Sequence, residues 1–460
     1  MLGIHGVGRD GADYYLSDFA RELPAPGPGH WAGRAAEGLG LAGPVGAVEF
    51  QRLLQGRHPR TGVVLGTGRT SLAAFDLTFS APKSASVLYA LAGPETARLV
   101  VAVHAEAVAG SLSYLERHGI TATRHSGPSR VVVPTSGALA AVFTHGVSRN
   151  GDPHIHSHVV LANLVHGADG RWGACDRRGI GAHRLAAAAV YEAHVRAGLS
   201  SALGVRWTSR PGRSGEVAGI GPEVLGEFSS RSADIRRHMD QWGAHAGRGA
   251  RVAWAVTRPA KESGLSFNEL TVRWQRQALA VGGQLALGRA PSRKGPGGPA
   301  TLDEHRFAGV ISVPAHGGAH RRDVVTAFGT AATDGASASV VEQLVSQWIP
   351  PGPPGVAEPL QQRRTVVPTN EQLRALGPRP VDPDDHAVWL GAARTLAAYR
   401  DRWGLSHEVE PLGDAARFQH RSALPADRLA DHVRTEREVA SARARLGWRE
   451  PVTVERGLGR

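Results

Sequence analysis

Hydrophobic and polar positions along roughly the first 285 residues follow two periods, one typical of strands and one typical of helices. In residues 73–80, Phe75, Leu77 and Phe79 alternate with Asp76, Thr78 and Ser80, which predicts a half-buried strand. Apolar runs predict further strands at 130–134 and 139–147. Helical periodicity predicts helices at 94–119, where Pro94 opens the helix and Gly119 ends it, and at 183–203 and 226–246.

The composition changes after this part of the chain. Pro and Gly are concentrated at 288–300 and again at 350–355, as in linkers, and amphipathic helices are predicted at 384–404 and 426–447. We therefore predict one large domain at 1–285, a Pro/Gly-rich linker region at 286–355, and a helical C-terminal region at 356–460 whose role the sequence does not give. For the large domain we expect an α+β fold, with a central, mainly antiparallel sheet and helices packed mostly on one side.

A histidine-rich stretch, RNGDPHIHSHVVLAN, occupies residues 149–163. Its residues 150–153 are typical of a turn, and the apolar residues 159–161 favour a strand that begins near His154. Alternate residues of a strand share a face, so His154, His156 and His158 are predicted on one side, where they could converge on a metal or a phosphate. A polar strand face in water is the alternative.

His145 belongs with these histidines because of strand pairing. If His145 faces His156 in an antiparallel pair, the hairpin is centred between Asn150 and Gly151, where the turn residues lie. His145, His156 and His158 would then form a compact triangle, suited to three neutral imidazoles around one divalent ion. His154 is expected at the rim, with a fourth ligand or a partner of a ligand as alternatives.

Asp76 and the adjacent pair Tyr14 and Tyr15 are further candidates. Asp76 is the one acid on the polar face of its strand, and it could orient a ligating histidine through the ring N–H or take a proton from a nucleophile. An edge-strand aspartate in water is the other interpretation. The tyrosine pair holds two of only six tyrosines in the chain, and it could anchor a core or accept a phosphoryl group.

Charge adds a partner class to this picture. The net charge of +12 and the isoelectric point near 10.7 indicate a polyanionic partner, with nucleic acid favoured. Only three of the 53 basic residues are lysine, which together with 58 Gly suggests a GC-rich coding bias behind part of the basicity.

A single cysteine, Cys175, excludes an internal disulfide and suits a reducing cytoplasm. There is no run of about 18 uninterrupted apolar residues and no signal sequence at Met1, so we expect a cytoplasmic protein without a membrane partner.

Several segments together resemble the relaxase domain of the MobF-type conjugative relaxases, within the HUH endonucleases. The resemblance covers about residues 1–285, and its motifs occur in the family's order and spacing: YYLSD (14–18), HWAGRAAEGLGLAG (30–43), FDLTFSAPKSASVLYAL (75–91), FTHGVSRNGDPHIHSHVVLANLV (143–165), DGRWGACDRRG (169–179), EFSSRSADI (227–235) and TRPAKE (257–262) before Trp274. It implies a palm-like HUH fold with His145, His156 and His158 as metal ligands and Asp76 as the active-site aspartate. It also implies Tyr14 as the first nucleophilic tyrosine, with Tyr15 beside it.

The same resemblance implies an activity. Members nick single-stranded DNA at an origin of transfer, in a site- and strand-specific way, and form a 5′-phosphotyrosine link during mobilisation of a plasmid or integrative element. The family favours Mg or Mn as the ion, whereas three imidazoles suit Zn, Ni or Mn. Lys83 and Arg149 are candidate contacts to the DNA backbone, with general surface charge as the alternative. Accessory relaxosome proteins, a separate helicase and a coupling protein are the partners to consider.

The sequence also departs from the family. Many members carry a second tyrosine pair, but no tyrosine occurs between Leu16 and Trp31, which puts multi-step strand exchange in doubt. No G-x-x-x-x-G-K-[ST] motif is present, so we expect no motor activity from 286–460, and a chain ending near Gly288 is expected to nick as well as the full chain.

Two other functions stay open at this point. One is a decayed relaxase that binds origin DNA without nicking it, which a nicking assay would reveal. The other is a histidine-triad nucleotide hydrolase, suggested by HIHSHVV, although Ser157 interrupts the apolar alternation of that motif. Metal dependence would separate it from a relaxase.

Overall fold

The computed structural model describes residues 1–16, 29–66, 72–126, 129–210, 213–241, 265–282, 321–348 and 426–447, together with scattered positions between 376 and 396. The chain divides into two compact units. The first comprises 1–303 with 328–343 and 353–357, and the second comprises 304–327, 344–352 and 358–460. The candidate site lies in the first unit.

The first unit is built on a five-stranded sheet with the order β1-β3-β7-β6-β2, in which every pairing is antiparallel. Its strands are β1 (Leu2–Val7), β2 (His30–Ala32), β3 (Ala74–Ser80), β6 (Ala140–Val147) and β7 (Pro153–Ala162). Three two-stranded ribbons accompany the sheet: β4 (Ala122–Ser126) with β5 (Ser129–Val133), β8 (Val165–His166) with β9 (Trp172–Gly173), and β10 (Trp207–Arg210) with β11 (Arg213–Val217). The long strand β7 is central, so its residues are flanked on both sides.

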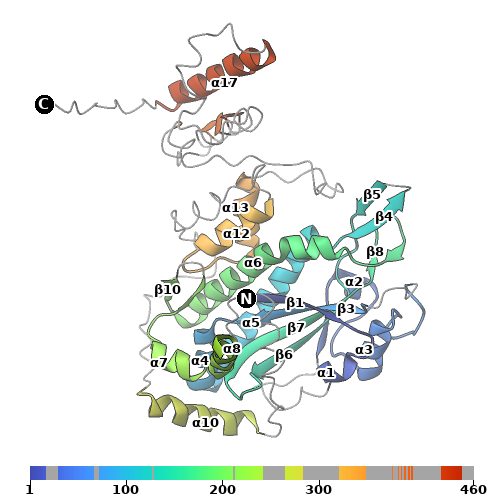
Figure 1. The fold of residues 1–460 in the computed structure, drawn as a ribbon, viewed down its shortest axis with the longest axis vertical. Helices are drawn as coiled ribbons and strands as arrows, with labels where there is room; N and C mark the ends of the chain where they lie inside the picture. The colour runs from blue at the N-terminus through green and yellow to red at the C-terminus, as the bar shows by residue number, and fades with distance from the viewer. Residues whose placement is uncertain are drawn as a thin grey trace, which may run out of the picture. The chain divides into compact units, whose positions relative to one another are not determined.

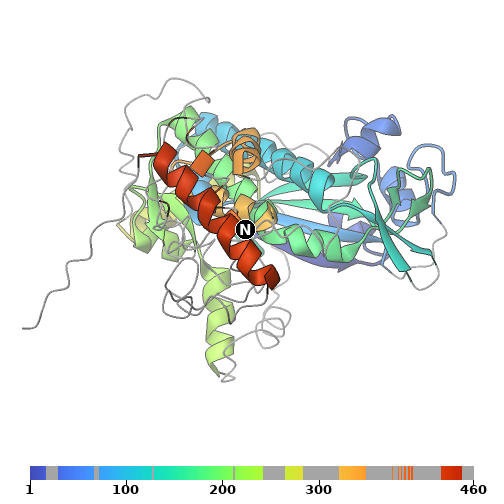
Figure 2. The same cartoon turned by 90° about the horizontal axis from the view of Figure 1, so that it is seen from above.

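One face of the sheet is covered by three helices, α4 (Lys83–Leu91), α5 (Pro94–His118) and α6 (Arg177–Leu203). Phe75, Leu77 and Phe79 point to this face and are at most 2% exposed, and the Phe79 ring lies 5.3 Å from that of Tyr191 in α6. Figures 1 and 2 show the long helices α5 and α6 lying along the sheet in two views at right angles. The predicted α+β class and the predicted strand at 73–80 are therefore confirmed.

The opposite face is only partly covered. The short helices α1 (Ala12–Leu16), α2 (Arg34–Gly38) and α3 (Ala47–Leu54) bury an apolar cluster that includes Trp31, Phe50, Phe143 and Val160. The histidines of β7 lie on this same face, nearer the start of the strand, where this cluster ends. His154 and His156 are partly exposed there, whereas His158 is buried at 8% exposure.

Two predicted segments differ in detail. The helix predicted at 226–246 is divided into α7 (Pro222–Glu227) and α8 (Ser230–Gln241), because the Ser230 N–H donates to the side chain of Asp152 rather than to a carbonyl of α7. The stretch 286–355, predicted as a linker region, contains α12 (Arg321–Ala331) and α13 (Ala338–Trp348). Between its Pro/Gly clusters, apolar residues are spaced three or four apart, as in helices. A prediction based on Pro and Gly content does not detect this spacing.

The remaining helices lie in or near the C-terminal half. Helix α10 (Phe267–Ala280) belongs to the first unit, and α17 (Ala426–Arg445) forms within the predicted helix at 426–447. The helix predicted at 384–404 falls largely outside the described residues. Among the helices that the structure describes, α5 alone is long and apolar enough to span a membrane, and it packs against α4, α6 and β7 as a core helix.

Candidate active site

Strands β6 and β7 form the hairpin that carries the histidines. His145 pairs with His156, and Thr78 of β3 pairs with His158, so the predicted hairpin register is confirmed. The pairing is irregular between His145 and Val147, which is where a bulge can re-aim a side chain. The hairpin thus brings His145, His156 and His158 to one face of the sheet.

The three imidazole rings form a triangle. Their centroids lie 5.2 Å apart for His145–His156, 5.5 Å for His145–His158 and 5.3 Å for His156–His158. Nδ1 of His158 donates to the Asp76 carboxylate at 2.8 Å, and Nδ1 of His156 donates to the backbone carbonyl of His154 at 2.9 Å. These bonds fix the tautomer in which Nε2 carries the lone pair, as in histidines that ligate metals.

The chemical nature of these three side chains suits a divalent metal ion. Three neutral imidazoles with an oriented Nδ1–H are a common ligand set for a divalent ion. Among the described residues, no three His, Cys, Asp or Glu side chains are already arranged around one point. The rings of His145 and His156 are stacked at 22°, so holding one ion through all three rings requires some ring rotation.

His154 lies on the same face, at the outer end of the row. Its ring is stacked on His156, with 4.7 Å between centroids. Burial, and then the nearby charges of His156 and Lys83, hold the pKa of His154 well below its usual value, so its ring is neutral at pH 7. Its role as a rim residue stays a prediction.

Asp76 is buried, at 5% exposure, and accepts three hydrogen bonds. Its Oδ2 accepts from His158 Nδ1 at 2.8 Å and from the Tyr15 hydroxyl at 3.0 Å, while Oδ1 accepts from Thr78 at 3.2 Å. A buried carboxylate is costly unless it is paired in this way. Of the two roles that the sequence left open, these contacts favour orientation of a ligating histidine.

The adjacent tyrosines lie in different surroundings. Tyr15 is 4% exposed, and its ring packs against Phe50 and Phe143. Burial, reinforced by the Asp76 charge and hydrogen bond, raises the pKa of Tyr15 far above its usual value. Tyr14 is 40% exposed, and its ring centroid lies 5.9 Å from that of His158. Tyr14 is therefore the tyrosine that an external group can reach beside the histidines.

The two basic residues predicted to contact DNA differ in the same way. Lys83 is drawn into the protein, where its ammonium donates to the Pro153 carbonyl at 3.0 Å, and burial lowers its pKa. These contacts do not favour a role for Lys83 on DNA. Arg149 lies beside the tyrosine, with its guanidinium carbon 5.6 Å from the Tyr14 ring centroid. It is therefore positioned to meet an anion that approaches Tyr14.

Distant residues hold the turn of the hairpin, a role that sequence reasoning did not assign to them although the motifs at 227–235 and before Trp274 include them. Asp152 Oδ2 accepts from the backbone and the hydroxyl of Ser230, and the Asn150 amide donates to Asp234, also in α8. The indole N–H of fully buried Trp274, in α10, donates to the carbonyl of Gly151 at 2.8 Å. Because these partners lie 78 to 123 residues further along the chain, no local pattern reveals their contacts with the turn.

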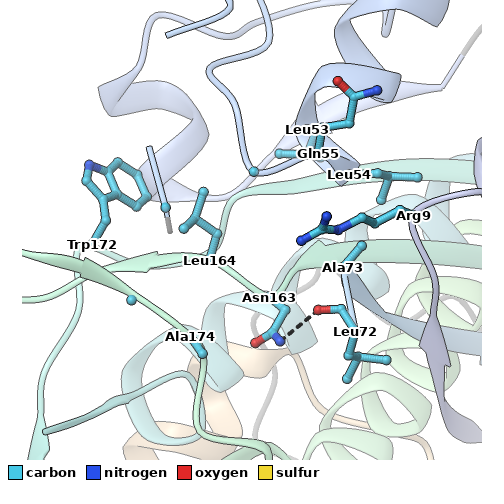
Figure 3. Close-up of a pocket in the computed structure, with 13 residues that line it drawn as sticks. Arg9, Leu53, Leu54, Gln55, Leu72, Ala73, Asn163, Leu164, Trp172 and Ala174 are labelled. Carbon is cyan, nitrogen blue, oxygen red and sulfur yellow. Dashed lines mark hydrogen bonds between the residues drawn. The ribbon is translucent and has the colours of Figure 1, made fainter. Parts of the chain in front are cut away.

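A pocket of about 100 Å³ lies at the other end of β7. It is lined by Arg9, Trp172 and Asn163 among others, and Figure 3 shows the Asn163 amide bonded to the Leu72 carbonyl. The Asn163 side-chain oxygen accepts from the Cys175 N–H, so both ends of this amide are already used. The histidine face offers more groups to a substrate.

Comparison with known proteins agrees with this geometry. The family model for the TrwC relaxase matches residues 6–281, which include strands β2, β3, β6 and β7 of the sheet, both tyrosines and all the histidines above. The chain belongs to the TrwC relaxase family. This membership confirms the resemblance to MobF-type relaxases and decides against a histidine-triad hydrolase.

The curated relatives of this chain include two multifunctional conjugation proteins TraI from Escherichia coli. One is 36% identical over 226 residues, covering 46% of this chain and 12% of TraI. The other, from strain K12, is 34% identical over 248 residues, covering 50% of this chain and 13% of TraI. The chain therefore spans about an eighth of the length of these relatives.

Solved structures of conjugative relaxase TrwC are also similar. The metal-bound complex of TrwC with oriT DNA has a TM-score of 0.56 and 27% identity, covering 62% of this chain and all of that one. A complex with a 27-mer DNA that comprises the recognition hairpin and the cleavage site has a TM-score of 0.55 and 26% identity, with the same coverage. Both likenesses support the α+β fold described above.

Proposed function

We propose that this protein is a DNA relaxase that nicks one strand at an origin of transfer, with Tyr14 as the nucleophile and His145, His156 and His158 holding a divalent ion. The observation that carries the proposal is the exposed Tyr14 ring beside the His158 ring, 5.9 Å between centroids. Family membership and the oriT DNA in the TrwC complexes supply the substrate class.

The reaction is a transesterification. The phenol oxygen of Tyr14 forms a bond to the scissile phosphorus, the bond from phosphorus to the 3′ oxygen breaks, and the strand is left joined to the protein through a 5′-phosphotyrosine. The phenol proton passes to solvent, and the departing 3′ oxygen takes up a proton. One phosphoester bond replaces another, so no ATP is needed and the reverse attack rejoins the strand.

The surrounding residues divide the remaining work. A bound ion, Mg or Mn by family and Zn or Ni by ligand type, would polarise the non-bridging oxygens of the phosphate. Asp76 orients His158, and Tyr15 keeps its proton and donates to Asp76. Arg149 is positioned to meet the phosphate charge next to Tyr14.

The partners follow from the same proposal. The DNA is single-stranded at the nick, and the net charge of +12 favours its binding. Accessory relaxosome proteins, a separate helicase and a coupling protein would act with the relaxase in mobilisation.

A nicking assay on metal-free protein tests the proposal. Labelled single-stranded oligonucleotides, tiled across the DNA beside the gene, are incubated with protein that has been treated with EDTA and dialysed. We expect no cleavage until Mg²⁺ or Mn²⁺ is restored, and cleavage at one site in one strand afterwards. Sequence-specific binding without cleavage under every metal condition would instead identify a decayed origin-binding protein.

A further inference from the structure

A chain of buried polar groups lies directly beneath the histidine hairpin, on the opposite face of the sheet. The Tyr191 hydroxyl of α6 lies 2.8 Å from Nδ1 of His104 in α5, and His104 Nε2 lies 2.8 Å from the hydroxyl of Ser157 in β7. The Ser157 hydroxyl is in turn 2.8 Å from that of Thr144 in β6. Three hydrogen bonds thus connect two helices with two strands.

The position of this chain relative to the candidate ligands is specific. Thr144 and Ser157 are a cross-strand pair, and the next pair along the hairpin is His145 with His156. Ser157 also separates His156 from His158 in β7. Because neighbouring residues of a strand point to opposite faces, the hydroxyl pair lies under the imidazoles without touching them. This placement explains why a serine interrupts the apolar alternation of β7.

The groups of the chain satisfy one another, and all but Thr144, which is partly exposed, are buried. His104, Ser157 and Tyr191 are each at most 1% exposed, and burial lowers the pKa of His104 to about 3. The ring is therefore neutral, with one nitrogen that donates and one that accepts, and each is used. Losing one partner would leave a buried polar group unpaired, which is the costly case.

We propose that His104, Ser157 and Tyr191 are positioning residues for the histidine cluster. They tie β6 and β7 to the helical layer at the one cross-strand pair next to His145 and His156, and so fix the separation of the imidazoles on the other face. The effect on metal binding rests on the proposed function, whereas the effect on the hairpin itself does not.

Two hydroxyl deletions, Tyr191→Phe and Ser157→Ala, test the proposal against matched controls. Tyr114→Phe removes an equally buried hydroxyl that lies 2.7 Å from Nδ1 of His183, also between α5 and α6. Ser111→Ala removes a buried hydroxyl bonded to the Ala187 carbonyl. All four variants remove one buried hydroxyl, but only the first two remove it beneath the hairpin.

Two readouts are compared with the melting temperature of each variant: Mn²⁺ affinity by calorimetry, and amide hydrogen exchange across residues 140–162. We expect Tyr191→Phe and Ser157→Ala to weaken Mn²⁺ binding by roughly 3- to 10-fold, less than for partners that touch a ligand. They should also speed exchange in the hairpin. Ser157→Thr keeps the hydroxyl and should restore both properties. The control variants Tyr114→Phe and Ser111→Ala should have a lower melting temperature, with Mn²⁺ affinity and hydrogen exchange in the hairpin unchanged.

The possible results distinguish a failure of the positioning role from a failure of the proposed metal site. If amide hydrogen exchange in the hairpin is unchanged, or rises equally in the control variants, the positioning role is wrong. This holds regardless of the Mn²⁺ affinity. Faster hairpin exchange with unchanged Mn²⁺ affinity would support the tie to the helices and overturn its effect on the cluster. If wild-type protein binds none of Mn²⁺, Mg²⁺, Zn²⁺ and Ni²⁺, the proposed metal site is wrong. Amide hydrogen exchange in the hairpin would then be the only test of the positioning role.

Discussion

Tyr14 and Tyr15 are adjacent in the chain, but their hydroxyl groups have opposite surroundings. Tyr15 is 4% exposed and donates to Asp76, whereas Tyr14 is 40% exposed beside His158 and Arg149. Since burial and Asp76 raise the pKa of Tyr15, its phenolate is not available for attack near neutral pH. At the scale of single residues, this contrast is why we propose Tyr14, and not Tyr15, as the nucleophile.

Asp76 should control the histidine cluster through His158. In Asp76→Asn the side chain keeps its shape but loses the charge and one of the two oxygens that accept hydrogen bonds. We expect Mn²⁺ affinity to fall by about 10- to 100-fold, as for other partners of metal ligands. Calorimetry measures this, with Asp169→Asn as the control, because Asp169 pairs with Arg124 in a ribbon apart from the cluster. Equal affinities for wild type and Asp76→Asn would show that Asp76 does not act through His158.

His104 should make the fold sensitive to acid. Burial lowers its folded pKa to about 3, so below about pH 6.5 the unfolded chain binds a proton that the folded protein does not. The stability from this residue is complete above pH 6.5 and is lost as the pH falls towards 3. Urea denaturation of His104→Gln, which cannot titrate, should therefore show a smaller loss between about pH 7 and pH 4.5, by about 2 kcal/mol. Parallel losses in the two proteins would mean that His104 is not held neutral.

At the scale of secondary structure, the hairpin was the most predictable element. Alternation in 73–80 and the turn residues at 150–153 were enough to give the strand, the His145–His156 register and the shared face of the histidines. The hydrogen bonds that hold the turn were not predictable, because Ser230, Asp234 and Trp274 reach the turn only through the tertiary fold. For the same reason the sequence did not reveal that Ser157 pairs with His104, 53 residues earlier.

Residues 328–343 pack on α6 closely enough to change one expectation from the sequence. The buried Arg196 guanidinium donates to the carbonyls of Gly329, at 2.6 Å, and Ala332, at 3.2 Å, where α12 ends. Gly335, with φ of +88°, lies so close to α6 that a Cβ there would meet the Ala197 nitrogen at 2.2 Å. The segment therefore belongs to the packing of the first unit.

A chain ending at Gly288 should accordingly be less stable than one ending at Trp348. Removing the carbonyl partners of Arg196 is expected to lower the free energy of unfolding by roughly 1–3 kcal/mol, since a buried charged donor loses its acceptors. Thermal and urea unfolding of the two chains measure the difference. Identical stabilities would restore the expectation that the relaxase unit ends near residue 285.

At the scale of the whole molecule, the family match and the fold cover different lengths of chain. The family model ends at residue 281, while the first unit also includes 328–343, so the packing extends past the part shared with the family. The net charge of +12 gives the molecule a general attraction to polyanions. The proposed chemistry depends on much less, namely one exposed tyrosine beside the histidine face.

The covalent intermediate is the most direct test of that claim. Wild-type protein is incubated with a cleavable origin strand and a divalent ion, resolved on a denaturing gel, and digested for mass spectrometry of the linked peptide. The account predicts an adduct on Tyr14, absent from Tyr14→Phe although that variant still binds DNA and metal, and largely retained in Tyr15→Phe. An adduct mapped to Tyr15, or an undiminished adduct in Tyr14→Phe, would contradict it.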